Sequence, residues 1–249
     1  MSHRILIVTT STARIDTDGP ETGFDWESVA VPYWRLREAG AEVAFASPRG
    51  GKPPGDPATA GAEDDRLYAV DRFLGDETAV TALADSAPLA MVEAPAWDAV
   101  LVTDGLGGLW DLAGEGGPAA LVTAIWAQGG VVGAIGAGTA ALIGAQGAEG
   151  RSFAAGRRLA TLPDAQLQAI ADQSDLAPPV LPETRLRAQG AEIWLDPAEA
   201  TEHLAAVQDG RLITGQDARA AADVALQMIE ALDAYAGLRR RASAAAPPD

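Results

Sequence analysis

The side chains that could carry chemistry in this chain are mainly carboxylates, because the sequence has no cysteine and only two histidines. Asp25 and Glu27 flank Trp26 at the start of a segment with helical spacing, and Asp104 follows a short apolar run. A carboxylate that packs against an aromatic wall has a raised pKa and suits general acid or base catalysis. We therefore take Asp104 and Glu27 as candidate catalytic residues and Asp25 as a candidate substrate-binding residue.

Each of these residues also has a purely structural interpretation. Asp25 and Glu27 would complement the dipole at a helix N-terminus, and Asp104 would be a solvated turn residue. We assign His3, at the start of the chain, and His203, in a polar stretch, to the surface. No spacing of two histidines and a carboxylate appears, so we expect no metal site.

The composition excludes several classes of function. The formal net charge of -17 argues against a nucleic-acid partner, because phosphate binding needs basic patches. The absence of cysteine excludes disulfides and thiolate sites, and no phosphate or dinucleotide fingerprint points to a cofactor. The N-terminus has no signal-peptide layout, and the most apolar stretch, residues 131–145, is too short to span a bilayer. We expect a cytoplasmic protein with no cofactor and no membrane contact.

The candidate residues must be positioned by an alternation of apolar runs and helical segments, which is typical of an α/β fold. A single domain is expected over residues 1–241, followed by a flexible tail at 242–249. The predicted strands are residues 4–9, 42–46, 99–103, 131–135, 192–195 and 211–214, all in one sheet. The predicted helices include residues 26–39, 118–128 and 218–238.

A series of motifs occurs in a specific order along these elements. The series consists of Thr22-Gly23-Phe24, Pro32-Tyr33, residues 39–43 (Ala-Gly-Ala-Glu-Val), residues 46–54 (Ala-Ser-Pro-Arg-Gly-Gly-Lys-Pro-Pro), Asp56-Pro57, Gly105-x-Gly107-x-x-Trp110-Asp111-Leu112 and residues 209–216 (Asp-Gly-Arg-Leu-Ile-Thr-Gly-Gln). Together they resemble the glyoxalase-III and chaperone branch of the PfpI-like, class I glutamine-amidotransferase-like superfamily. The resemblance implies a flavodoxin-like three-layer sandwich with a mostly parallel sheet, small cap insertions and a homodimer. It also places the pocket at the carboxyl ends of the strands, as is general for open α/β sheets.

The sequence departs from that family at its catalytic set. Gly136 and Ala137 match the family's Cys-His pair, and Ser28 matches its supporting glutamate, with Glu27 one residue away. Val31 replaces a histidine, and the Gly-Gly-His-Gly loop reads Asp-Gly-Leu-Gly at residues 104–107. Cysteine-dependent glyoxalase, deglycase, protease and amidotransferase activities are therefore excluded.

The backbone of such a site can persist without the thiol. A nucleophile elbow often holds its central residue at positive φ, which Gly136 adopts without steric cost. The amides of Gly105 and Ala137 would then form a donor pair for an oxyanion. The pocket is expected to be more apolar than the family norm. The expected substrate-binding residues are Gly136, Leu106, Trp26, Trp110, Asp25, Ser28 and Thr139, although Thr139 also fits a helix-start role and the tryptophans also fit a core.

Two hypotheses remain open. The first is a cofactor-free enzyme that uses general acid/base and oxyanion-hole catalysis on a small apolar or aromatic carbonyl compound, for example in isomerisation, dehydration, cyclisation or rearrangement of a secondary metabolite. The second is a catalytically dead dimeric protein with a binding, regulatory or chaperone-like role. The replacement of the polar constellation as a set, with one carboxylate added, favours the enzyme.

Overall fold

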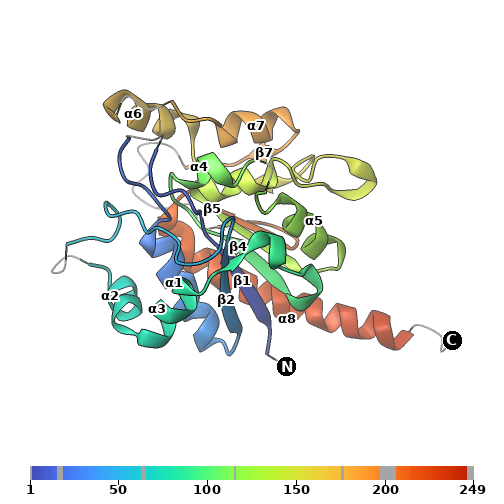
Figure 1. Ribbon diagram of the computed structural model, residues 1–249. Helices are drawn as coiled ribbons and strands as arrows, with labels where there is room; N and C mark the ends of the chain where they lie inside the picture. The colour runs from blue at the N-terminus through green and yellow to red at the C-terminus, as the bar shows by residue number, and fades with distance from the viewer. Residues whose placement is uncertain are drawn as a thin grey trace.

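The computed structural model describes residues 2–15, 19–62, 66–114, 116–174, 177–196 and 206–245 (Figure 1). A seven-stranded sheet with strand order β3-β2-β1-β4-β5-β9-β8 forms its centre. Its strands are parallel except for β8, which pairs antiparallel with β9. The strands are β1 (Arg4–Val8), β2 (Glu42–Ser47), β3 (Ala87–Pro88), β4 (Ala99–Val102), β5 (Val131–Ile135), β8 (Val207–Asp209) and β9 (Leu212–Gly215).

The central strands are apolar throughout because both faces of the sheet are covered, as parallel sheets require. Along β1, Ile5 and Ile7 belong to the hydrophobic core on one face, whereas Leu6 and Val8 belong to the core on the other. Successive side chains of a strand point to opposite faces, so one run of apolar residues supplies both cores. The predicted three-layer α/β architecture with a mostly parallel sheet is confirmed.

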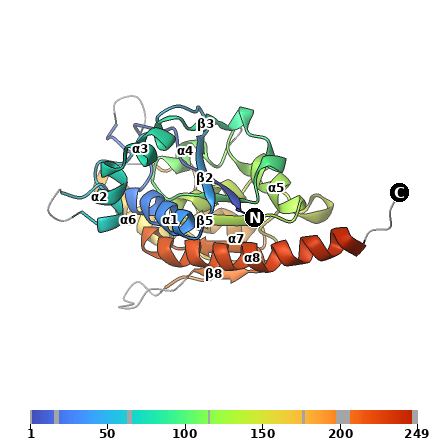
Figure 2. The ribbon, with the colours of Figure 1, turned by 90° about the horizontal axis from the view of Figure 1, so that it is seen from below.

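One face of the sheet is covered by α1 (Trp26–Glu38) and α8 (Ala221–Ala245), which pack against each other (Figure 2). Two short helices, α2 (Tyr68–Gly75) and α3 (Glu77–Ala84), extend this layer, and α5 (Ala119–Ala127) covers the opposite face. Helix α1 ends where Gly40 adopts φ +84°, a conformation that glycine takes without steric cost. Helix α8 continues to Ala245, into the segment expected to be a tail, and residues 246–249 lie outside the described ranges.

A small cap lies above the carboxyl ends of the central strands (Figure 1). It contains α6 (Asp164–Ser174), α7 (Pro182–Ala188) and a separate two-stranded parallel sheet of β6 (Arg158–Leu159) and β7 (Glu192–Ile193). The prediction that residues 192–195 join the main sheet is therefore wrong. Only two residues form β7, and their pairing partner is the equally short β6 of the cap.

No helix in the described part of the chain is long and apolar enough to cross a membrane.

Candidate active site

The chain turns sharply where β5 passes into a short 3₁₀ helix, η4 (Gly136–Leu142). Gly136 has φ +52° at this turn, as predicted for the elbow. A Cβ atom at residue 136 would lie 2.2 Å from the carboxyl atoms of Asp104. The Asp104 carboxyl group therefore occupies the space into which a side chain at the elbow would project.

Asp104 is held in this space by backbone amides. Its Oδ1 accepts hydrogen bonds of 2.7 Å from the N–H of Gly105 and 2.7 Å from the N–H of Ala137. These are the two amides that the sequence predicted as an oxyanion hole. The expectation of a donor pair open to substrate is wrong for this structure, because the carboxylate of the same chain occupies both donors.

The environment of Asp104 favours its protonated form. Burial raises the pKa of Asp104 to about 7, and the nearby charge of Asp25 acts in the same direction. The amide hydrogen bonds from Ala137 and Gly105 oppose this rise, because they stabilise the ionised carboxylate. A carboxyl group balanced in this way changes protonation state near neutral pH.

The N-terminus of α1 is fixed directly to this residue. The N–H of Asp25 donates a 2.9 Å hydrogen bond to the carbonyl of Asp104, and Asp25 Oδ1 accepts one of 2.9 Å from the N–H of Ser28 as the N-cap. Gly105 has φ +130°, and a Cβ there would lie 2.3 Å from the carbonyl oxygen of Gly23. Glycine at 105 thus permits the close approach of the two segments.

Asp25 and Glu27 have both of the properties that the sequence suggested. They begin α1 as charges favourable to its dipole, and both line a cavity. Burial raises the pKa of each carboxyl group, and the charge of Asp25 raises that of Glu27 further.

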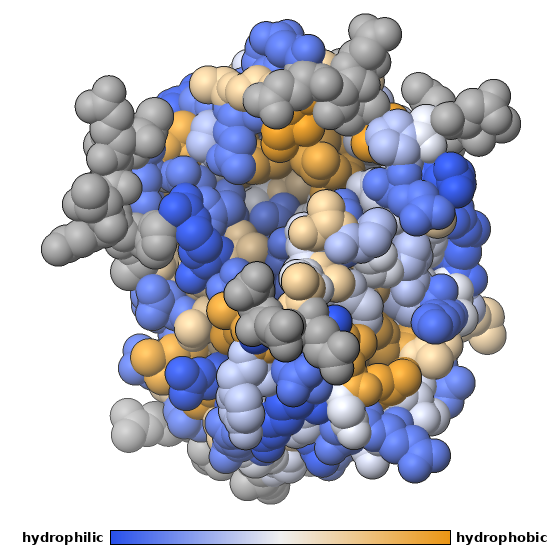
Figure 3. Space-filling model, turned by 90° about the vertical axis from the view of Figure 1, so that its left-hand side faces the viewer, coloured by the Kyte–Doolittle hydropathy of each residue, from blue (hydrophilic) through white to orange (hydrophobic). Residues whose placement is uncertain are grey.

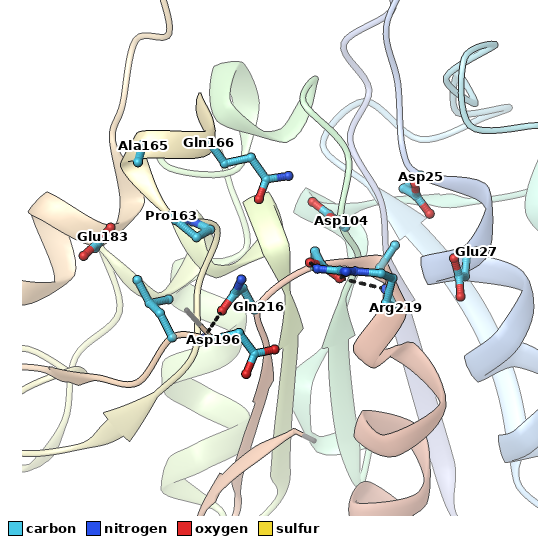
Figure 4. Close-up of a pocket in the computed structure, with 13 residues that line it drawn as sticks. Asp25, Glu27, Asp104, Pro163, Ala165, Gln166, Glu183, Asp196, Gln216 and Arg219 are labelled. Atoms are coloured by element: carbon cyan, nitrogen blue, oxygen red, sulfur yellow. Dashed lines mark hydrogen bonds and ion pairs between the residues drawn. The ribbon is translucent and has the colours of Figure 1, made fainter. Parts of the chain in front are cut away.

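The cavity has a volume of about 1000 Å³ and lies between the ends of the strands and the cap. Figure 4 places Asp25 and Glu27 across it from Glu183, with Asp104 between the two walls. The face in Figure 3 is hollowed, with hydrophilic residues along one side of the depression and hydrophobic residues above it. The lining residues are Asp25, Glu27, Asp104, Pro163, Ala165, Gln166, Glu183, Leu195, Asp196, Gln216, Asp217, Ala218 and Arg219.

The apolar lining predicted from the sequence is not found in this cavity. Leu106 and Trp110 line a separate, narrow apolar pocket beside α6. Trp26 packs edge-on against Phe24 and Phe73 as part of a core. These side chains pack against the hydrophobic interior and do not line the cavity, since large apolar side chains gain most from burial.

The remaining predicted binding residues, Ser28 and Thr139, hydrogen-bond to backbone groups of the site and do not line the cavity. Ser28 is buried, and its hydroxyl donates to the carbonyl of Asp25. Thr139 is also buried and donates to the carbonyl of Gly136 at 2.7 Å, with a further hydrogen bond to Thr161. Neither residue, nor Gly136, lines the cavity.

Sequence reasoning missed the polar groups of the far wall and of the loop after β9. Arg219 lies in the short 3₁₀ helix η6 (Ala218–Ala220) that ends this loop, where its guanidinium and backbone N–H bind the carboxylate of Asp217. The motif that ends at Gln216 could have indicated that the residues after β9 belong to the site, because it marks the carboxyl end of the strand next to the elbow strand β5. Glu183 and Gln166 belong to the cap, which the resemblance implied but whose residues the sequence did not identify.

No group of three or more potential metal ligands occurs among the residues that the structure describes.

Comparison with known families gives one match. A profile of the DJ-1/PfpI family matches residues 21–231. No functionally curated protein matches the chain.

The fold is shared with several solved structures. Rapid Encystment Protein 24 KDa (REP24) of Francisella tularensis superposes with a TM-score of 0.82 at 25% identity, covering 93% of this chain and 99% of that one. Glyoxalase III of Candida albicans gives 0.78 at 22% identity, covering 93% and 98%. A ThiJ/PfpI domain protein of Brachyspira murdochii gives 0.61 at 15% identity, covering 94% and 98%.

Proposed function

The chain belongs to the DJ-1/PfpI family, and we propose that it is a cysteine-independent, cofactor-free enzyme in which Asp104 transfers protons on a carbonyl-containing substrate. The observation that carries this proposal is the position of Asp104. Its carboxyl group accepts hydrogen bonds from two backbone amides and lies next to the elbow glycine, Gly136. Burial raises the pKa of this carboxyl group to about 7. General acid/base catalysis is most efficient when the pKa of the catalytic group lies near the working pH.

The cycle requires only the two protonation states of one carboxyl group. Ionised Asp104 takes a proton from a C–H beside the carbonyl or from a hydroxyl group, and protonated Asp104 returns that proton to another atom of the intermediate. The amides of Gly105 and Ala137 fix the orientation of the carboxylate by binding Oδ1. This chemistry covers isomerisation and, when the proton goes to a leaving hydroxyl group, dehydration.

The cavity supports a different substrate from the one expected at first. Its lining is rich in carboxylates and carries Gln166, Gln216 and Arg219 as possible hydrogen-bond donors. A substrate with polar groups fits this lining better than the small apolar or aromatic compound predicted from the sequence. The homodimer and the cytoplasmic location remain predictions.

One observation favours the second hypothesis, a binding or regulatory protein without turnover. Both amides of the elbow are occupied by Asp104, so they are not free to stabilise a substrate oxyanion unless this side chain moves. The position of the same carboxyl group on the cavity favours the enzyme, because a group with a pKa of about 7 that faces a bound substrate can exchange protons with it near neutral pH.

A solvent-exchange assay tests the proposal without a known substrate. The protein is incubated in D₂O with a panel of ketones, hydroxyketones and aldehydes that includes amine-bearing members, and ¹H NMR records the loss of signals next to the carbonyl. We expect Asp104→Asn to slow the exchange of an accepted compound by about 10²–10⁴-fold. Asp85→Asn is the matched control, because Asp85 is exposed and outside the cavity.

Equal rates for Asp104→Asn and the unmodified protein would refute the role of Asp104. Absence of any exchange or conversion across the panel would favour the binding protein.

A further inference from the structure

The peptide unit between Gly136 and Ala137, the elbow peptide, carries two polar groups that bind different partners. Its N–H, which belongs to Ala137, donates a 2.7 Å hydrogen bond to Oδ1 of Asp104. Its carbonyl, which belongs to Gly136, accepts a 2.7 Å hydrogen bond from the hydroxyl group of Thr139. A peptide unit is planar, with its N–H and C=O on opposite sides, so a partner that fixes the carbonyl also fixes the direction of the N–H.

The elbow peptide needs such a partner because it follows a glycine. Gly136 has φ +52°, and glycine adopts positive and negative φ values about equally well. The 3₁₀ helix η4 restrains the peptide through its backbone hydrogen bonds, whose geometry is poorer than that of an α-helix. The Thr139 hydroxyl group adds a second restraint on the same carbonyl.

Thr139 is itself oriented by a residue of the cap. Thr161 lies between β6 and α6, and its hydroxyl oxygen is 2.5 Å from that of Thr139. A hydroxyl group has one proton to donate. Because the proton of Thr139 goes to the carbonyl of Gly136, Thr161 is the donor and Thr139 the acceptor in this pair. The two hydrogen bonds form a chain that runs from the cap to the elbow peptide.

Both hydroxyl groups are shielded from solvent. Thr139 and Thr161 are 0% exposed, and neither of them lines the cavity. Solvent therefore does not compete for these hydrogen bonds, and a fully satisfied buried network favours a single arrangement. Because the pair is separate from the cavity, any effect that it has on Asp104 passes through the elbow peptide.

We propose that Thr139 and Thr161 are positioning residues of the site, a hydroxyl pair that ties the cap to the elbow peptide and holds its N–H toward Asp104. This inference rests on the proposed function, because it assigns the residues that orient the group proposed to be catalytic. A shift of the cap against the elbow would then change the hydrogen bonding of Asp104. The pair thus couples the cap, which borders the cavity, to the residue that transfers the proton.

The titration of Asp104 tests this role without a substrate. Protein labelled with ¹³C at the aspartate carboxyl groups is titrated by NMR, and the resonance of Asp104 is identified by its loss in Asp104→Asn. Thr139→Val nearly keeps the shape of the side chain but removes its hydroxyl group. The amide hydrogen bond from Ala137 lowers the pKa of Asp104, so an N–H that is held less firmly lets this pKa rise. We expect a rise of roughly half a unit or more.

Thr139→Ser and Thr123→Val are the matched controls. Thr139→Ser retains the hydroxyl group, so the titration of Asp104 should remain that of the unmodified protein. The Thr123 hydroxyl group has the same two roles on α5, because it donates to the carbonyl of Ala119 at 2.8 Å and accepts from the N–H of Gln146 at 2.9 Å. We expect Thr123→Val to lower the stability of the protein without changing the pKa of Asp104.

Thr161→Val tests the link to the cap, and it decides the matter alone if Thr139→Val does not fold. We expect a smaller rise in the pKa of Asp104, and the double variant should show no larger rise than Thr139→Val, because Thr161 acts through Thr139. The charges of Asp25 and Asp217, which act on Asp104, are the same in all these variants. An unchanged titration in Thr161→Val, or additive rises in the double variant, would refute the link.

An unchanged titration of Asp104 in Thr139→Val, or a rise of equal size in Thr123→Val, would overturn the proposal. The outcome is independent of the exchange assay. A titration that shifts as expected supports the positioning role even when no compound of the exchange panel is converted. An unshifted titration together with Asp104-dependent exchange would refute the positioning role and leave the proposed catalysis intact.

Discussion

Asp104 and Asp111 are two half-buried carboxylates on the same segment, and their surroundings differ in one decisive respect. Burial raises the pKa of both. At Asp111 each oxygen has a partner, because Thr10 Oγ1 donates to Oδ1 at 2.7 Å and the N–H of Ser11 donates to Oδ2 at 2.7 Å. At Asp104 both donors converge on Oδ1, and Oδ2 accepts no hydrogen bond from the described residues.

The difference shows that burial and a raised pKa do not by themselves make a catalytic site. Asp111 is a structural cross-link between the loop after β1 and the short helix α4 (Gly108–Asp111), and it does not line the cavity. Asp104 is fixed by two amide hydrogen bonds to Oδ1, and its carboxyl group lines a cavity large enough for a ligand. The oxygen that no protein group binds and the cavity it borders together distinguish the candidate catalytic residue from the structural one.

The largest effect is expected from filling the space that Asp104 occupies. Gly136→Val places a Cβ at 2.2 Å from the Asp104 carboxyl atoms and forces a β-branched residue to φ +52°. Backbone strain costs about 1–3 kcal/mol, and overpacking adds roughly 1–3 kcal/mol. The measurement is the free energy of unfolding from denaturant titration.

Gly51→Val is the matched control for this variant. Gly51 has φ +70° but nothing within 4 Å of its Cβ position, so it reports the strain without the clash. We expect Asp104→Ala to recover part of the stability lost in Gly136→Val. Equal losses in Gly136→Val and Gly51→Val would show that Asp104 does not fill the elbow.

A smaller effect, which depends on pH, is expected from Asp104→Asn. Because the pKa of Asp104 is about 7 in the folded state and 3.8 ordinarily, the unfolded chain loses this proton first as the pH rises. The contribution of Asp104 to stability is therefore fully present below about pH 4 and is lost as the pH approaches 7. The melting temperature of Asp104→Asn relative to the unmodified protein should rise between pH 4 and 7 and then level off.

Each unit of difference between the two pKa values corresponds to about 1.4 kcal/mol, and each kcal/mol to roughly 2–4 °C in a chain of this size. Asparagine keeps an oxygen for both amides, so the comparison isolates the charge. A difference in melting temperature that does not change with pH would contradict the raised pKa.

The smallest of the three effects is expected from Asp111→Ala. The variant leaves the Thr10 hydroxyl and the Ser11 amide without their acceptor, and an unsatisfied buried group costs about 1–3 kcal/mol. The rate and the pH dependence of exchange should remain those of the unmodified protein, with Asp85→Ala as the surface control. A shifted pH profile in Asp111→Ala would remove the distinction between the two carboxylates.

Much of the fold could be predicted from local patterns. The strands β1, β4 and β5 were recognised as apolar runs, and the positive φ at Gly136 follows from glycine at an elbow position. The resemblance implied small cap insertions, but their elements were not located in the sequence, because β6 and β7 have two residues each and α6 and α7 carry no clear apolar periodicity. Strands of two residues gain their stability from the contacts around them and leave little trace in the sequence.

The sequence by itself determined the family, the absence of thiol chemistry and the importance of the segment at residues 104–107. Only the tertiary structure decided that the Asp104 carboxylate occupies the amide pair and that the cavity is lined by carboxylates. The reason is that both facts depend on residues from distant parts of the chain. Ala137, Arg219 and Glu183 reach the site only when the elbow, the loop after β9 and the cap are brought together at one edge of the sheet.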